Sequence, residues 1–143
     1  MPKQNVSTVA LASNVNVPQG MLSEFANLPV LDLKMIKNLE KEMTTRGLRN
    51  YLTFFLAGSP ERLEEIAKVA NAGDFEQLSF IAHDLVSTSG NIGALQMSCL
   101  ARALARSCRA RDSKAARLLL GELAIAALAS NVEIRKWMGS KQP

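Results

Sequence analysis

The chain has 143 residues, of which 48% are apolar, 21% charged and only 5% aromatic, and its formal net charge is +4. This length suits one ordinary domain with a real core, and the charge is lower than most dedicated nucleic-acid-binding proteins carry. The apolar run at residues 9–12 is too short for a signal peptide. The longest apolar run, residues 118–129, contains Glu122 and falls short of the ~20 residues of a spanning helix. We therefore expect a soluble, cytoplasmic protein that does not enter a membrane.

The two cysteines, Cys99 and Cys108, are separated by nine positions and have no histidine nearby. This spacing does not favour a zinc site. We expect both thiols to pack as small apolar groups in a reducing compartment.

The pattern of apolar residues in the N-terminal half of the chain changes near Pro29. Residues 1–28 carry little charge and show no sustained period, which predicts a flexible leader with room for a short helix over 21–26. Asp32 is a plausible N-cap, and apolar residues at helical spacing predict a first helix over 32–44.

A second helical segment starts near Thr45 and ends at Gly73. Pro60 lies within this segment, and two interpretations of its effect are open. It either starts a new helix with Ser59 as its cap, or kinks a long one.

The C-terminal half contains three more helical patterns. Asp74 caps the third helix, with Gln77 at the third helical position, and Gly90 and Gly93 mark its end. The fourth helix is expected over 94–110. Its predicted seam consists of Met97, Leu100, Leu104 and Ser107. Its opposite side carries the arginines Arg102, Arg106 and Arg109.

A turn at residues 111–113 precedes a last helix over 114–138. Its predicted seam alternates spacings of four and three: Ala116, Leu120, Leu123, Ala127, Ser130, Ile134 and Trp137. No strand pattern of useful length is present. The sequence therefore predicts an all-α fold: an antiparallel, up-and-down four-helix bundle with a short N-terminal capping helix. The bundle would occupy residues 29–138, and residues 139–143 would form a tail.

His83 is the only histidine, and histidine is the side chain best suited to exchange a proton near neutral pH. On the third helix it lies about 140° from Leu78, which is on the predicted buried face, so we expect it to be exposed. Small residues surround it and two apolar residues flank it: Ser79, Ser87 and Gly90, with Phe80 and Val86.

Spacing alone leaves three readings of His83. It is a surface residue without a special role, a metal ligand, or a reactive or partner-docking group. The metal reading is poorly supported, because there is no second histidine and Glu76 and Asp84 point in different directions. The small neighbours favour docking, since they would let another protein's backbone come close.

The stretch around His83 resembles the signature of histidine-containing phosphotransfer (HPt) domains, roughly Ala-His-x-Leu-Lys-Gly-x-Ser-x-x-x-Gly-Ala. The residues in register are Ala82, His83, Leu85, Ser89, Gly93 and Ala94. Residues 30–32, residues 70–75 and the leucine- and arginine-rich helix after the motif are also similar to the family. The resemblance covers about residues 29–138.

Two positions depart from the signature. Val86 replaces the usual lysine and Ser87 the usual glycine. In the family that lysine is thought to balance the charge of the phosphoryl group, so its loss would slow transfer or destabilise the phosphorylated form. Another cation could take over, but the predicted direction of the arginine face on the fourth helix does not place it near His83.

The resemblance implies a phosphorelay intermediate. His83 would accept a phosphoryl group from a receiver-domain aspartate and pass it to a response regulator, and a hybrid sensor kinase would belong to the same relay. Docking would use Ser79, Phe80, Val86, Ser87 and Gly90. The partner receiver would supply Mg²⁺, and this chain would act as a monomeric phosphocarrier without a cofactor of its own.

The sequence offers no nucleotide-binding glycine-rich loop, because residues 90–93 do not follow a strand. We therefore do not expect an enzyme that uses ATP.

Two rival functions come from other classes. An adaptor or inhibitor module would dock a kinase or receiver without transferring anything, and Val86 favours it. Nucleic-acid binding would use the basic residues Arg102, Arg106, Arg109, Arg111, Lys114 and Arg117. Because no aromatic residue is interleaved among them to stack on bases, a solvated helix face is the better interpretation.

Overall fold

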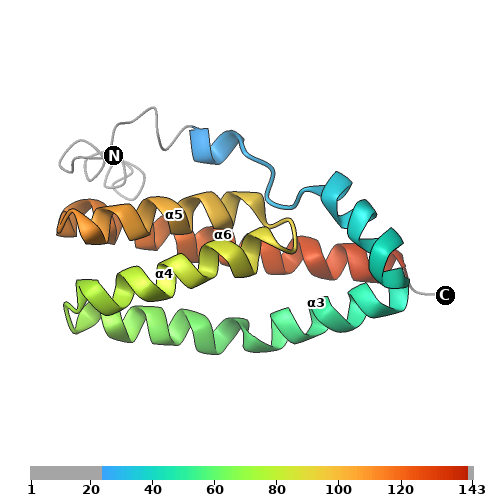
Figure 1. The fold of residues 1–143 in the computed structure, drawn as a ribbon, viewed down its shortest axis with the longest axis horizontal. Helices are drawn as coiled ribbons and strands as arrows, with labels where there is room; N and C mark the ends of the chain where they lie inside the picture. Colours follow the sequence, from blue (N-terminus) through green and yellow to red (C-terminus); the bar gives the residue numbers. More distant parts are fainter. Residues whose placement is uncertain (1–23, 142–143) are drawn as a thin grey trace, which may run out of the picture.

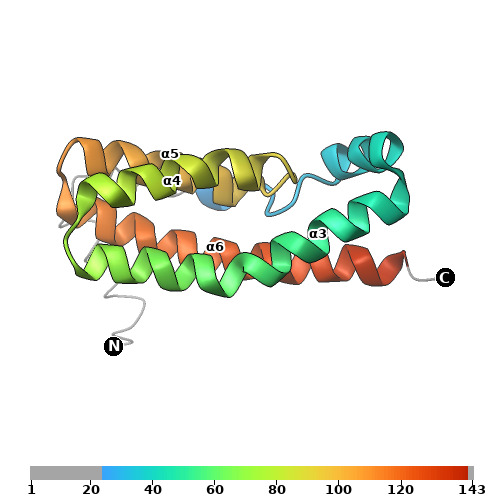
Figure 2. The ribbon, with the colours of Figure 1, turned by 60° about the horizontal axis from the view of Figure 1, so that its bottom comes forward.

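The computed structural model describes residues 24–141, which contain four long helices and no strand. These are α3 (Leu33–Asn71), α4 (Phe75–Gly90), α5 (Leu95–Arg109) and α6 (Ser113–Ser140). Figures 1 and 2 show that consecutive helices run antiparallel and that α3 and α6 close the ring opposite α4 and α5. The predicted all-α, up-and-down four-helix bundle is confirmed.

Thr44 divides α3 into a short first part, residues 33–43, and a long second part. Its φ of 68° and ψ of 161° are non-helical, and a positive φ is unusual for a β-branched residue. The Thr44 hydroxyl accepts a hydrogen bond from the Gly47 amide at 3.1 Å, as an N-cap does. The two helices predicted on either side of this point are therefore both present.

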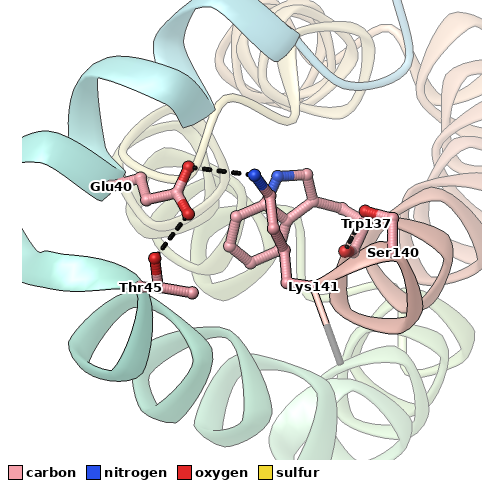
Figure 3. A network of polar contacts seen from close by, with 5 residues as sticks. All are labelled: Glu40, Thr45, Trp137, Ser140 and Lys141. Atoms are coloured by element: carbon pink, nitrogen blue, oxygen red, sulfur yellow. Dashed lines mark hydrogen bonds and ion pairs between the residues drawn. The ribbon is translucent and has the colours of Figure 1, made fainter. Parts of the chain in front are cut away.

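The short first part of α3 is held against the C-terminal end of α6 (Figure 3). The Thr45 hydroxyl donates to a carboxylate oxygen of Glu40 at 2.6 Å, and the Lys141 ammonium lies 3.4 Å from the other oxygen. The hydrogen bond from Thr45, followed by the charge of Lys141, holds the pKa of Glu40 below its ordinary value. The Lys141 ammonium also lies 5.7 Å from the ring centroid of Trp137. The predicted capping helix is thus fixed at the end of the bundle where α6 finishes.

Pro60 lies inside α3 with helical backbone on both sides, so no new helix starts there. Side-chain hydrogen bonds lie on both sides of the proline. The Asn131 side-chain amide donates to the buried Ser59 hydroxyl at 2.9 Å. The Arg62 guanidinium donates to the Phe55 carbonyl at 2.8 Å and lies 4.4 Å from the centroid of the Phe55 ring.

Aspartates begin three of the helical segments, as expected of N-caps. The Asp32 carboxylate accepts hydrogen bonds from the backbone amides of Lys34 and Met35. Asp74 accepts one from Gln77, and Asp112, which lies in the turn before α6, accepts one from Ala115. The ends predicted at Gly73 and Gly90 agree with the structure to within two residues.

The core lies along the bundle axis and follows the predicted seams. On α4 the buried residues are Leu78, Ala82, Leu85 and Ser89. On α5 and α6 the predicted seam residues that are buried are Met97, Leu100, Leu104, Ala116, Leu123, Ala127, Ser130 and Ile134. The remaining seam residues, Ser107, Leu120 and Trp137, are half-buried.

The chain is already held on the bundle before α3 begins. Residues 24–27 are helical, and Phe25 packs against the core. The Gln96 side-chain amide donates to the carbonyls of Phe25 and Leu28, at 3.0 and 3.3 Å. The rest of the predicted leader, and the first part of the helix expected over 21–26, lie outside the described residues.

Helix α6 is long and apolar enough to cross a membrane by length and composition, with a mean hydropathy of 1.4 in its most apolar stretch. Half of that stretch is buried inside the bundle. The core helix of a bundle has the same properties, so this feature is weak support for a membrane span.

We expect Ser59→Ala to lower the free energy of unfolding by about 1–3 kcal/mol, because it leaves the buried Asn131 amide without its acceptor. The side-chain carbonyl of Asn131 is also buried without a hydrogen-bond partner among residues 24–141. Replacing both partners with apolar groups, in Ser59→Ala/Asn131→Leu, should therefore recover most of the loss. Urea denaturation measures both effects, and a double variant as unstable as Ser59→Ala would contradict this account.

Candidate functional site

His83 lies on the outward face of α4 and is exposed, as predicted. Its position follows from the helical phase. Ala82 is fully buried and Leu85 is 3% exposed, so residues on either side of His83 hold the opposite face of the helix in the core. The ring is therefore available to a group approaching from solvent.

The other residues of the motif are used for packing. The buried Ser89 hydroxyl donates to the Leu85 carbonyl at 2.5 Å, and Ala94 is fully buried. A Cβ at Gly90 would lie 3.2 Å from the Ser98 hydroxyl oxygen, so α4 approaches α5 closely there.

Gly93 forms the turn between α4 and α5. Its φ of 79° lies in the left-handed region that favours glycine. A Cβ there would lie 3.3 Å from the Asp32 carbonyl oxygen, and the Asp32 amide donates to the Gly93 carbonyl at 2.7 Å. The turn at the end of the motif is thereby tied to the start of α3.

The residues predicted to surround His83 differ in exposure. Phe80 is 65% exposed, and Ser87 is also exposed. Ser79 and Val86 are half-buried, and Val86 packs against the core. Gly90 is half-buried and turned toward α5. The apolar part of the exposed surface near His83 is therefore mostly Phe80.

A hollow of about 510 Å³ lies beside His83, between α4 and the end of α5. Its lining residues are Phe75, Glu76, Ser79, Phe80, His83, Cys108, Arg109 and Arg111. Arg109 and Arg111 therefore share a surface with His83, which corrects our expectation that the arginine face points away from it. The expectation treated the helix in isolation, whereas the antiparallel packing sets the end of α5 beside the start of α4. Arg102 and Arg106 are exposed and do not line the hollow.

A second hollow of about 390 Å³ lies between α3 and α4, and Phe80 lines both hollows. Its charged lining residues are Arg62, Glu65 and Asp84. The Arg62 guanidinium is already engaged with the carbonyl and ring of Phe55, and its burial lowers the pKa of that group. It is not free to serve a ligand at His83.

Within residues 24–141, no group of three or more histidine, cysteine, aspartate or glutamate side chains is placed to hold a metal ion. Cys108 is buried and Cys99 half-buried, and both are free thiols. Burial raises the pKa of the Cys108 thiol, with the charge of Arg109 acting in the opposite direction. Cys108 therefore packs as a small apolar group, as expected.

Comparison with known proteins gives two findings. The family model of the Hpt domain matches residues 50–133. The fold is similar to a crystal structure of histidine-containing phosphotransfer protein B (HptB) from Pseudomonas aeruginosa PAO1, with a TM-score of 0.74 and 22% sequence identity over 81% of this chain and 100% of that one. A search of curated proteins finds no match.

We expect Gly93→Ala to lower the free energy of unfolding by at least about 1–2 kcal/mol, because alanine is strained at this φ and its Cβ would press on Asp32. Gly73→Ala is the matched control, since Gly73 has a φ of 72° but nothing within 4 Å of an added Cβ. Chemical denaturation should show the larger loss for Gly93→Ala. Equal losses would mean that the contact with Asp32 adds nothing.

Proposed function

Because the chain belongs to the Hpt domain family, we propose that it is a phosphorelay intermediate in which His83 accepts a phosphoryl group from a receiver-domain aspartate and passes it to a response regulator. One observation carries the proposal. His83 is the motif residue whose functional group is exposed, whereas most of the other motif residues are buried and support the helix and turn that present it.

The transfer step needs a neutral imidazole with an accessible lone pair. A ring nitrogen of His83 forms a new N–P bond, the P–O bond of the partner's acyl phosphate breaks, and the aspartate carboxylate leaves with the electron pair. The protonated ring then releases a proton to solvent. Alignment and charge neutralisation supply most of the acceleration in such transfers, and the partner receiver would bring Mg²⁺.

The docking surface would consist of Phe80 and Ser87, with Ser79, Val86 and Gly90 at its edges. Phe80 stands between two hollows, and its exposure is large for an apolar side chain. An aromatic anchor beside small residues suits a transient contact of modest area with a receiver domain. The same relay would include a hybrid sensor kinase.

We further propose that the phosphotransfer unit spans residues 29–138, with residues 1–28 as a leader whose Phe25 packs against the bundle and residues 139–143 as a tail whose Lys141 pairs with Glu40. The protein would act as a cytoplasmic monomer and carry the phosphoryl group without an ATP site of its own.

An adaptor or inhibitor that docks a receiver or kinase without transfer is the second candidate. It is favoured by Val86, which puts an apolar, half-buried side chain where the family usually has a lysine. The two functions share a docking surface and differ in whether His83 is ever phosphorylated.

We expect the wild-type protein to take acid-labile label from a phosphorylated receiver domain, and His83→Gln to take none, because glutamine keeps the polarity of the site but lacks the nucleophile. Gel autoradiography before and after mild acid measures the label. Binding of the receiver by both proteins with label on neither would reject the carrier and leave the adaptor.

We expect Val86→Lys to speed transfer or to lengthen the lifetime of the phosphohistidine by up to about fivefold, which corresponds to an exposed ion pair of at most about 1 kcal/mol. Single-turnover transfer and decay of the label measure the two effects. Val86→Met is the control for added length without charge. If neither rate changes in the lysine variant, the absence of a lysine at position 86 does not limit transfer or the lifetime of the phosphohistidine.

A further inference from the structure

Helices α3 and α5 end in the same backbone motif, but with different residues at its left-handed position. At the end of α3 this residue is Gly73, with a φ of 72°. The Gly73 amide donates to the Ala70 carbonyl at 3.0 Å, and the Asp74 amide donates to the Val69 carbonyl at 3.3 Å. This is the Schellman arrangement, in which glycine is the usual residue.

At the end of α5 the left-handed residue is Arg111, with a φ of 58°. The Arg111 amide donates to the Cys108 carbonyl at 3.1 Å, and the Asp112 amide donates to the Ser107 carbonyl at 3.0 Å. Glycine adopts this conformation without the steric penalty that a Cβ causes. An arginine at this position therefore makes the turn less stable than a glycine would. The conformation of the turn does not explain why this residue is an arginine.

The Arg111 side chain lines the hollow beside His83, together with Arg109 from the last turn of α5. Both arginines are exposed. The ion pairs among residues 24–141 join Lys136 to Glu133 and Lys141 to Glu40, so neither arginine is engaged in one.

A phosphoryl group on His83 would meet acidic neighbours on its own helix. Glu76 lines the same hollow, and Asp84 faces the hollow toward α3 with Glu65. Val86 supplies no charge, and the guanidinium of Arg62 is engaged with Phe55. The cations that share a surface with His83 are those at the end of α5.

We propose that the guanidinium groups of Arg111 and Arg109 bind the phosphoryl group on His83, in the role that the family usually gives to the lysine replaced here by Val86. This inference rests on the proposed function. Guanidinium is always charged, and its planar fork matches the oxygens of a phosphoryl group. The charge would thus come from the turn after α5, and the nucleophile from α4.

The test uses the full chain phosphorylated chemically with phosphoramidate, so that it does not depend on a receiver. A lone pair of His83 forms the N–P bond, the P–N bond of the reagent breaks, and ammonia leaves with that electron pair. Because the chain has one histidine, every phosphohistidine signal in the ³¹P NMR spectrum belongs to His83, and its pH titration gives the pKa of the phosphohistidine, ring and phosphoryl group together.

We expect the pKa of the phosphohistidine to be higher in Arg111→Gly than in wild type by roughly 0.2 to 0.7, because loss of a nearby cation favours the protonated form. Arg109→Ala/Arg111→Gly should raise it further, and Arg111→Lys should keep it near the wild-type value. Arg106→Ala removes a charge from α5 outside the hollow and should leave it unchanged. The thermal midpoint of Arg111→Gly should be no lower than that of wild type and up to about 5 °C higher, since glycine adopts the conformation of this turn without strain.

Three results would overturn the inference. One is a pKa of the phosphohistidine that is the same in Arg111→Gly and wild type. Another is an equal rise in Arg106→Ala, which would indicate only overall charge. The third is weaker binding of Arg111→Gly to an unphosphorylated receiver with no change in this pKa, which would make Arg111 a docking residue. If the pKa changes as expected but no receiver labels His83, the phosphoryl-binding site stands and the proposed relay function falls.

Discussion

Helices α4 and α5 approach each other so closely that a side chain on Gly90 would press against Ser98. The Ser98 hydroxyl bridges the helices by donating to the Val86 carbonyl at 2.8 Å. The rotation of α4 about its axis is fixed by these contacts and by the tie between Gly93 and Asp32. A change of rotation would turn His83 toward a neighbouring helix, so the exposure of the histidine depends on packing at the opposite face.

The proposed function divides its requirements between two elements of different rigidity. The proposed nucleophile, His83, lies in the middle of a helix, where backbone hydrogen bonds and core contacts hold it in place. The cations sit at a helix end and in a turn, on long side chains that can follow a phosphoryl group as it arrives and leaves. A carrier must bind this group well enough to accept it and weakly enough to release it. Exposed ion pairs, which are individually weak, suit that requirement better than a buried pocket would.

Much of this structure could be predicted because its determinants are local. Aspartate caps, terminal glycines and the spacing of apolar residues on α4 depend on neighbours within a few positions of the chain. The sequence leaves both interpretations of Pro60 open, because the side-chain contacts around it come from Arg62 and from Asn131, which is 72 residues away from Ser59. The hollow beside His83 could not be found from a single helix, since it arises between two. The left-handed turn at Arg111 carried no local signal, because an arginine lies directly before the capping aspartate of α6, where a glycine would be expected.

The contact of Lys141 with Trp137 has a practical consequence for following the molecule in solution. Trp137 is the only tryptophan, and it lies where the short first part of α3 meets the end of α6 (Figure 3). Its emission therefore reports on the separation of that cap. Tryptophan fluorescence and far-ultraviolet circular dichroism would give coincident melting curves only if the cap and the four-helix core unfold as one cooperative unit.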